Sequence, residues 1–470
     1  MVCLFELASA LVHGCKLHVS MSRADRDQFR RLLTDEFDAI ARIVAGIDAR
    51  DAQISKVEDR GHILPRIEAL APEGAGDAEE AGFGRVTALV AEALRGWLVD
   101  AAKAELAALP AAERGTSGLL NQVATLLQDQ GKLEEAEPLF RAALEGRREV
   151  WGERHPETLT SMNNLAGLLY AQGKLGEAEP LYRAVLEGSR EVLGERHPST
   201  LTSMGNLGSL LEDQGKLGEA EPLYRAALEG KREALGERHP STLTSMDNLA
   251  GLLEAQGKLR EAEPLCRAAL EGCREVWGER HQDTLASMNN LAALLEDQGK
   301  LGEAEPLYRA ALEGRREVLG ERHPHTLASM NNLAGLLKNQ GKLGEAEPLF
   351  RADLEGSREV LGERHPETLI STGNCTDLLR QMGRLAEARS VLGDAVAVAE
   401  EVFGARHVRV LVIQAQVARL LAAEGDAQGT EGLAQVVAVM EEVLGPDHPH
   451  TRKYTAALGE LRAGGAHAVS

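Results

Sequence analysis

Aromatic residues make up only 3% of this 470-residue sequence. Strands of β-sandwiches and β-barrels are rich in Tyr, Phe and Trp, so an all-β fold is not expected. Hydrophobic residues still reach 43% of the chain. Since most of these are Leu, Ala and Val, the composition favours closely packed helices.

Cysteine is also scarce, with five residues at Cys3, Cys15, Cys266, Cys273 and Cys375. Their number is odd and no two form a CxxC pair, so neither a disulfide framework nor a zinc site is indicated. Reduced thiols predict a cytoplasmic protein, with association with the cytoskeleton left open. Cys266 stands where other copies of the repeat described below have Tyr or Phe, which predicts a role in the core.

Long apolar runs and an excess of basic residues are both absent. No run is long enough to cross a membrane, so no membrane insertion is expected. Residues 1–21 are mildly apolar but contain Glu6 and lack a basic start, so they are taken as an extension of no assigned role. Either Met1 or Met21 could be the first residue. The net charge of −21 argues against nucleic-acid binding, which needs clustered Lys and Arg.

The sequence repeats itself at a fixed period. A GERHP-type motif recurs every 42 residues, and an eighth copy follows one residue short of that interval. Its histidines are His155, His197, His239, His281, His323, His365, His407 and His448. A second motif, QGKL or a relative, recurs with the same period. This self-similarity predicts eight repeats over residues 116–451.

Each repeat has the pattern of two helices. In the unit at 158–199, apolar residues occur twice at helical spacing. The first stripe is Met162, Leu165, Ala166 and Leu169, and the second is Ala178, Tyr182, Val185 and Leu186. Gly173 and Gly194 are expected to end the two helices. Because one hairpin cannot bury both stripes, the hairpins must stack into a solenoid.

These residues carry a family likeness. The patterns LAxLL, QGKLxEAEPLYRAxLE and LGxRHPxT resemble the 42-residue tetratricopeptide repeats (TPR) of kinesin light chains. The resemblance implies an all-α fold: a right-handed superhelical solenoid of stacked helix-turn-helix hairpins with a small helical N-terminal region. It also implies a non-enzymatic scaffold or cargo adaptor, with kinesin heavy chain as one partner.

The regions outside the repeats are also expected to be helical. Residues 22–115 should hold two helices within 22–70, a linker near 71–82 and a third helix over 86–109. A cap on the first repeat is the favoured role, and a separate adaptor module is the alternative. Residues 452–470 should form a C-terminal capping helix and tail. Kinesin light chains place a coiled coil before their repeats, but apolar heptad spacing here covers only about two heptads, fewer than predict a coiled coil.

No motif for catalysis or for a cofactor is found. The GERHP histidines stand one hairpin apart, on the order of 10 Å, too far to share a metal ion. QGKL lacks the first glycine of a phosphate loop, and its Lys is followed by Leu rather than Ser or Thr. No Ser-His-Asp, paired-acid or HExxH pattern occurs. The chain is therefore predicted not to be an enzyme and to need no cofactor or metal.

Binding residues are expected where the copies vary while the scaffold stays constant. Positions 163, 167 and 170 share a face of the first helix, offset from its packing stripe, and the resemblance places this face in a concave groove. The predicted groove residues are Asn121, Asn163, Tyr170, Glu212, Asp247, Glu254, Asn289, Glu296, Asn331 and Lys338. Such a groove is polar, acidic in its middle and basic toward one end.

A second polar set is nearly the same in every copy. It comprises Asn164, Asn206, Asn248, Asn290 and Asn332. Constancy suits a structural hydrogen bond between hairpins at least as well as ligand contact, so both interpretations stay open.

The leading hypothesis is a scaffold or adaptor that binds extended peptides or partner helices in the groove. The acidic middle favours basic segments. Two alternatives remain. The array is either a sensor or regulatory part of a signalling complex whose catalytic part lies on another chain, or a self-assembling structural rod.

Overall fold

The computed structural model describes residues 78–393, 395–446 and 448–467. The expectations for residues 1–77, including the extension, the first two helices and most of the linker, lie outside the described residues. In the part of the chain that is described, every regular element is a helix and no strand occurs. The chain divides into two compact units, residues 1–230 and 231–470, each described here by itself.

Unit 1 begins with a long helix ahead of the repeats. This helix, α5 (Ala78–Ala108), starts earlier than the predicted third helix, so residues 78–82 are helical rather than part of a linker. Its Val90, Leu98 and Leu106 are buried, and it packs against α7 (Gly118–Asp129), the first helix of the first repeat. Helix α5 thus covers the start of the repeat row, the role expected of an N-terminal cap.

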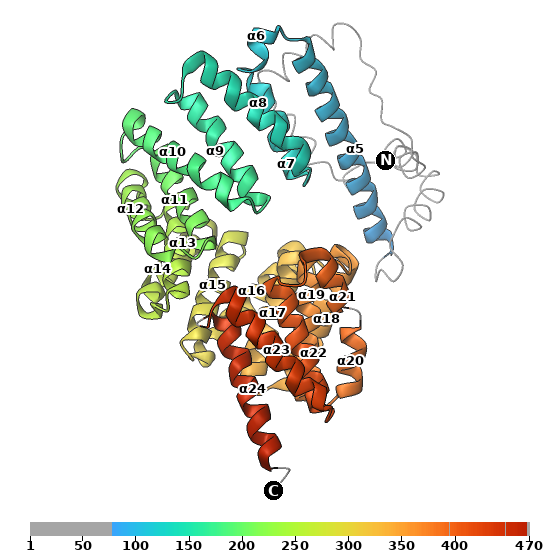
Figure 1. Cartoon of the computed structure of the whole chain (residues 1–470). Helices are drawn as coiled ribbons and strands as arrows, with labels where there is room; N and C mark the ends of the chain where they lie inside the picture. Colours follow the sequence, from blue (N-terminus) through green and yellow to red (C-terminus); the bar gives the residue numbers. More distant parts are fainter. Residues whose placement is uncertain (1–77, 394, 447, 468–470) are drawn as a thin grey trace, which may run out of the picture. The chain divides into compact units, whose positions relative to one another are not determined.

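The rest of unit 1 is a row of antiparallel helix pairs (Figure 1). Its helices are α6 (Ala111–Arg114), α8 (Leu133–Trp151), α9 (Pro156–Ala171), α10 (Leu175–Leu193), α11 (Pro198–Asp213) and α12 (Leu217–Leu235), the last of which crosses the unit boundary. Helix α8 packs both on its own first helix, α7, and on the first helix of the next repeat, α9, and α10 packs in the same way on α9 and α11.

The histidine of each GERHP motif begins the first helix. Nδ1 of His155 accepts the backbone N–H of Glu157 at 3.2 Å, and Pro156 occupies the first helical position, both of which favour a helix start. The same cap recurs at His197, His239, His281, His323, His365, His407 and His448. An accepting nitrogen carries no proton, so this cap requires neutral histidine.

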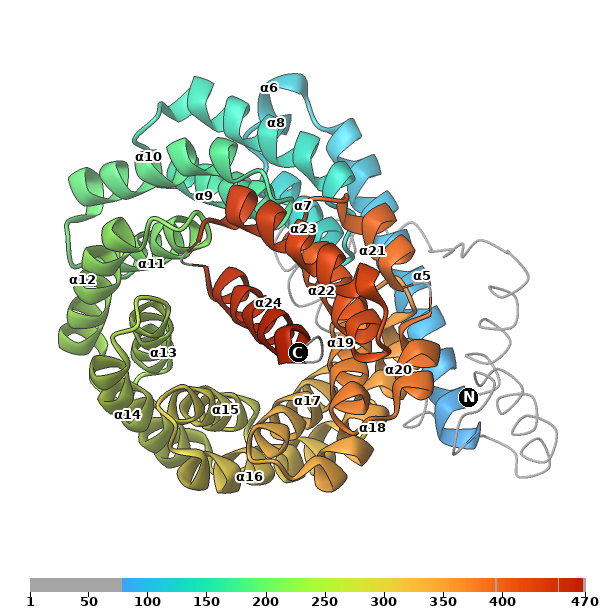
Figure 2. The same cartoon turned by 60° about the horizontal axis from the view of Figure 1, so that its bottom comes forward.

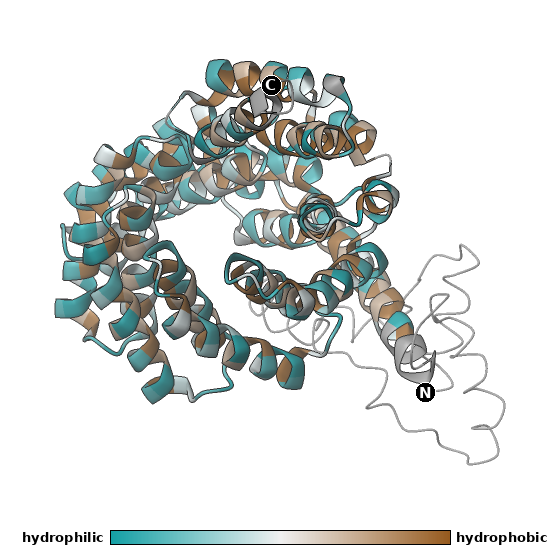
Figure 3. Cartoon of the chain, turned by 90° about the horizontal axis from the view of Figure 1, so that it is seen from below, coloured by the Kyte–Doolittle hydropathy of each residue, from teal (hydrophilic) through white to brown (hydrophobic). Residues whose placement is uncertain are grey.

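Glycine ends the first helix, and the apolar stripes form the core. Gly173 follows α9 with φ of +74°, and the N–H of Lys174 reaches the carbonyl of Leu169 at 2.8 Å, as in other glycine-ended helices. All eight predicted stripe residues of the 158–199 unit are buried. Figure 3 shows the resulting pattern, with hydrophobic and hydrophilic bands alternating along each helix.

Ion pairs join the second helices of neighbouring repeats. Lys174 Nζ lies 2.8 Å from Glu137 Oε2 in the preceding repeat. These bonds, with that from Arg141, lower the pKa of Glu137 to about 2. Equivalent pairs in unit 2 are Lys300 with Glu263 and Lys342 with Glu305. Each partly exposed pair adds little stability, but together they account for the Lys and Glu positions of the QGKLxEAEPLYR pattern.

Unit 2 continues the same architecture. Its helices are α13 (Pro240–Ala255), α14 (Leu259–Trp277), α15 (Gln282–Asp297), α16 (Leu301–Leu319), α17 (Pro324–Asn339), α18 (Leu343–Leu361), α19 (Pro366–Gln381), α20 (Leu385–Leu392), α21 (Ala395–Phe403), α22 (Val408–Ala423), α23 (Ala427–Leu444) and α24 (Pro449–His467). Within this unit, the first helices α13, α15 and α17 form an inner row and the second helices α14, α16 and α18 an outer row (Figure 2).

The C-terminal end of unit 2 departs from the repeat pattern. A turn at Gly393, whose φ is +42°, divides the second helix of the seventh repeat into α20 and α21. Helix α24 then packs on α22 and α23, and its Tyr454 and Leu458 are buried against Leu411 and Met440. Helix α24 lies where a C-terminal helix was expected over residues 452–470, begins earlier, at Pro449, and covers this end of the row.

Candidate functional site

The predicted groove residues lie on the first helices of the repeats. Asn121, Asn163, Tyr170 and Glu212 belong to unit 1, and Asp247, Glu254, Asn289, Glu296, Asn331 and Lys338 belong to the inner row of unit 2. Nine of the ten are half-buried, and Asn289 is buried, with 7% exposed. They lie where neighbouring first helices approach one another, whereas the fully exposed stripe of α13 includes Asn248, Gly251 and Ala255.

The second asparagine set divides into two classes. Asn206 donates to Asn163 at 2.9 Å, and Asn290 hydrogen-bonds to Asp247, so these two asparagines join adjacent first helices. Asn374, the next copy, likewise donates to Asn331 at 2.9 Å. Asn164, Asn248 and Asn332 form no such bond within the described residues, which leaves their side-chain amides available to a ligand.

Four carboxylates on α13 and α15, namely Asp247, Glu254, Glu296 and Asp297, are termed the acidic segment. Burial raises the pKa of Glu254 to about 7, with the charge of Asp297 adding to the shift. Burial likewise raises the pKa of Asp247 to about 6. Asn339 donates to Glu296 at 2.7 Å. No Lys or Arg of the described residues forms an ion pair with any of the four, although the charge of Lys338 acts on Glu296 and lowers its pKa, which burial raises.

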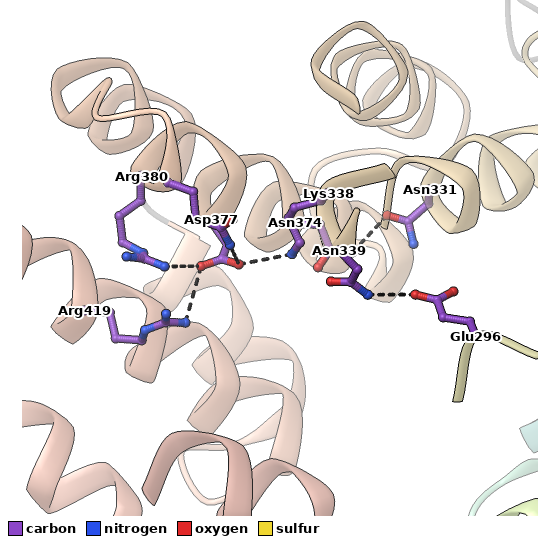
Figure 4. Close-up of polar contacts among 9 residues, drawn as sticks. Glu296, Asn331, Lys338, Asn339, Asn374, Asp377, Arg380 and Arg419 are labelled. Atoms are coloured by element: carbon purple, nitrogen blue, oxygen red, sulfur yellow. Dashed lines mark hydrogen bonds and ion pairs between the residues drawn. The ribbon is translucent and has the colours of Figure 1, made fainter. Parts of the chain in front are cut away.

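A different arrangement occupies the next first helices, and Lys338, Asp377, Arg380 and Arg419 are termed the charge cluster (Figure 4). Asp377 receives Lys338 Nζ at 3.1 Å, Arg380 Nη2 at 2.9 Å and Arg419 Nη1 at 3.3 Å. Burial alone would raise the pKa of Asp377, but these three cations hold it well below the ordinary value. Lys338, predicted as the basic end of the groove, is thus paired with a buried carboxylate.

The groove residues of unit 1 also bond to neighbouring residues outside the predicted set. Tyr170 of α9 donates to Asp213 of α11, in the next repeat, at 2.5 Å. Tyr224 donates to Glu212 at 3.0 Å. Burial raises the pKa of Glu212. Polar residues of this face therefore contribute to repeat stacking as well as being partly accessible.

Lys338 and its next copy, Arg380, stand at the basic end predicted for the groove, but Asp377 and Arg419 were not predicted as site residues. Asp377 stands where the other copies have Gly, Ser or Ala, at positions 167, 209, 251, 293 and 335. Arg380 follows three residues later, which places both side chains on one helix face. The sequence signal that could have identified the cluster was an acidic residue at a position where the other copies have a small residue, followed three residues later by an arginine.

Other predicted sites have structural roles. Cys266 and Cys273 are buried in α14, each with 3% exposed, and burial raises the pKa of Cys266 to about 12. A search of the described residues finds no group of three or more His, Cys, Asp or Glu that could hold a metal ion. No helix described here is both long and apolar enough to cross a membrane.

The repeats match known family models. A tetratricopeptide-repeat model matches residues 115–190, 162–233, 205–275, 241–317, 283–352 and 325–401. A second model, also described as a tetratricopeptide repeat, matches residues 410–450. No curated protein matches the chain.

Solved structures also resemble parts of the chain. The nearly identical TPR-like repeats assigned to kinesin light chain in Podosopora anserina are 26% identical over 44% of this chain and 98% of that one, with a TM-score of 0.39. BtubC (BKLC) from P. vanneervenii is 24% identical over 50% of this chain and 94% of that one, with a TM-score of 0.43. The quorum sensor NprR from B. thuringiensis is 12% identical over 73% and 97%, with a TM-score of 0.46.

The family matches extend over residues 115–401 and 410–450, well over half of the chain, and these are the residues of α7 to α23. Stacked hairpins of this type present extended surfaces for protein–protein interaction and are typically non-catalytic scaffolds. The chain belongs to the tetratricopeptide-repeat family.

Proposed function

We propose that the chain is a scaffold that binds extended, basic segments of partner proteins along the first helices of its repeats, with the acidic segment as the main contact. The carrying observation is that, among the described residues, no Lys or Arg forms an ion pair with Asp247, Glu254, Glu296 or Asp297. Holding half-buried carboxylates ionised without partners costs free energy. A Lys or Arg from a partner would offset that cost.

Unpaired amides support recognition of an extended chain. The side-chain amide of Asn248 is exposed and forms no hydrogen bond to another described residue. An asparagine amide donates to a carbonyl and accepts from an N–H at the same time, which matches the backbone of a peptide without secondary structure. Contacts of this type give affinity, and the carboxylates select basic side chains.

A cargo adaptor that binds kinesin heavy chain is a more specific form of this proposal, and cytoplasmic location belongs with it. Co-purification of a heavy chain with the full-length protein would support this form. The rod alternative has less support, because α24 covers the apolar surface of α22 and α23 at one end of unit 2 and leaves less surface there for end-to-end stacking.

Affinity capture followed by mass spectrometry tests the proposal. The groove variant carries Glu212→Lys, Glu254→Lys and Glu296→Lys, each introducing the residue type that Lys338 already provides at the equivalent position. The matched control carries Glu195→Lys, Glu237→Lys and Glu279→Lys, which make the same change of charge in exposed loops between repeats. Partners lost only from the groove variant support the proposal, and an unchanged partner list contradicts it.

A further inference from the structure

A polar slot lies between each second helix and the next first helix. On the second helix, the slot is lined by the residue at one fixed repeat position. In successive repeats this residue is Arg147, Ser189, Lys231, Cys273, Arg315 and Ser357. On the first helix, the slot is always lined by serine, in order Ser161, Ser203, Ser245, Ser287, Ser329 and Ser371. A cation therefore alternates with a small side chain, which gives the array a period of 84 residues on top of the period of 42.

Where a cation is present, it fills the slot in a reproducible way. Arg147 Nη1 donates to Ser161 Oγ at 2.7 Å, and Arg315 Nη1 donates to Ser329 Oγ at 2.7 Å. Lys231 Nζ does the same to Ser245 Oγ at 2.8 Å. Arg147 is only 3% exposed, so the slot accommodates a largely buried guanidinium.

The slot at Ser189, in unit 1, is open. A cavity of about 320 Å³ is lined there by Val185, Ser189 and Leu193 of α10 together with residues of α9 and α11, including Asn163 and Ser203. Its lining repeats the positions that surround Arg147 one repeat earlier, with serine replacing arginine. The slot one repeat earlier therefore indicates that this space fits a guanidinium group.

An asparagine stands beside four of the six slots, and its hydrogen bonds differ between filled slots and the open slot. Next to filled slots, Asn121 donates to Ser161 at 3.4 Å and Asn289 to Ser329 at 3.5 Å. Next to the Ser189 slot, Asn163 instead accepts from Asn206. The serine of the open slot donates only to a backbone carbonyl, from Ser203 Oγ to Ser199 at 2.9 Å, so its oxygen is available to accept from a cation.

The slot at Ser357, in unit 2, contains an uncompensated carboxylate. Asp353 stands where four other copies have Ala and one has Val, and it is only 2% exposed. Ser357 Oγ donates to its Oδ1 at 3.3 Å, whereas its Oδ2 has no hydrogen-bond partner in the described part of the chain. A buried carboxylate without a cation is costly, and the cation found in alternate slots is missing here.

From this alternation we infer that the two serine slots, at Ser189 and at Ser357, are sockets that each receive one lysine or arginine side chain from a partner protein. The inference deepens the proposed function, on which it rests, by assigning basic side chains to defined positions. The Ser357 socket is the stronger of the two because Asp353 adds a carboxylate to the serine oxygens.

The open socket is reachable from the proposed binding surface. The residues at its rim, Pro156, Thr160, Ser199 and Thr202, are exposed. Asn163, a predicted groove residue, forms part of its wall. A segment lying along the first helices could therefore place one side chain in the socket while its backbone remains on the surface.

A self-filled variant, in which the chain itself places an arginine in each socket, tests the inference. The variant Ser189→Arg with Ser357→Arg copies Arg147 and Arg315 at equivalent positions, and the chain already accommodates arginine there. The comparison variant, Ser189→Ala with Ser357→Ala, removes these serine oxygens without adding a cation to either slot, so it separates the loss of the oxygens from the filling of the slots. Binding is measured by fluorescence anisotropy against a library of extended decapeptides that carry arginine, each paired with a peptide in which neutral, nearly isosteric citrulline replaces arginine.

We expect wild type to bind arginine peptides about tenfold more tightly than citrulline peptides, a ratio typical of losing a hydrogen bond to a charged group. The alanine variant should keep a reduced preference through Ser203 and Asp353. The self-filled variant should lose this preference. A preference that survives self-filling would overturn the sockets while leaving the groove proposal intact. No preference in wild type would also overturn the sockets, and failure of all the peptides to bind would contradict both proposals.

A second variant tests the inference even if the self-filled variant does not fold. Asp353→Ala introduces the residue of four other copies and removes a buried carboxylate, so the fold should be at least as stable as wild type. It should nevertheless weaken the preference for arginine peptides. An unaltered preference in this variant would overturn the role of the Ser357 socket.

Discussion

The acidic segment and the charge cluster lie on equivalent helices of unit 2, yet their carboxylates behave in opposite ways. Glu254 lacks a cation, and burial raises its pKa to about 7. Asp377 is also buried, but three cations hold its pKa well below the ordinary value. The helix lengths and histidine caps are the same in α13 and α19, although Thr372 and Cys375 in the core of α19 replace Met246 and Leu249 of α13. In this scaffold, two or three polar positions on each first helix therefore set the local chemistry.

The largest expected effect follows from breaking the charge cluster. Asp377→Ala leaves Lys338, Arg380 and Arg419 close together without their shared carboxylate, and we expect a loss of about 3–5 kcal/mol in the free energy of unfolding. Urea unfolding followed by circular dichroism measures it. Because the folded-state pKa of Asp377 is depressed below 3.8, this stabilisation should be complete at neutral pH and be lost only in strong acid.

A double variant sharpens that result. Asp377→Ala combined with Arg380→Ala should cost less than the sum of the two single changes, because the second removes a charge that the first left unpaired. Additive losses, or a loss below about 1 kcal/mol for Asp377→Ala, would contradict the importance assigned to the cluster.

A smaller and pH-dependent effect is expected in the acidic segment. The folded-state pKa of Glu254 is raised from 4.5 to about 7, so its ionised form destabilises the fold above that pH. Glu254→Gln should therefore stabilise the protein at pH 8 by about 1 kcal/mol, after allowance for partial exposure. The gain should shrink as the pH falls to 5, because the wild-type carboxyl is then protonated.

Thermal or urea unfolding at several pH values measures this gain. Glu313→Gln, on an exposed part of α16, controls for the change of residue type on a helix surface. A gain for Glu254→Gln that is the same at pH 5 and pH 8 would show that burial of the charge is not its cause.

The smallest expected change in stability concerns the repeat position that is glycine on α13, in the acidic segment, and Asp377 in the charge cluster. Gly251 is equivalent to Asp377, and a Cβ added there meets nothing within 4 Å. Gly251→Ala should stabilise α13 by about 0.5–1 kcal/mol through helix propensity. Gly272→Ala in α14 is the contrasting variant, since its Cβ would lie 2.4 Å from Leu243 Cδ2 and should be destabilising. Differential scanning calorimetry compares them, and equal shifts would contradict this account.

Periodicity alone was enough to predict the repeated hairpins, the buried stripe around Met162 and the helix end at Gly173. The role of the GERHP histidine as a helix cap depends on backbone geometry that the motif does not specify. Pairing of Lys338 with Asp377 joins residues 39 positions apart, and only stacking shows that they meet. The alternation of Arg147, Ser189 and Lys231 was visible in the copies but gained meaning from the bonds to Ser161 and Ser245.

Site-specific photo-crosslinking tests most directly whether partners bind on the first helices. A photoreactive residue is placed either at Asn248, on the exposed stripe of α13, or at Arg260, on the exposed surface of α14. Captured partners are expected to crosslink at position 248 and not at position 260. Crosslinking at position 260 alone, or at neither position while the partners still co-purify, would contradict it.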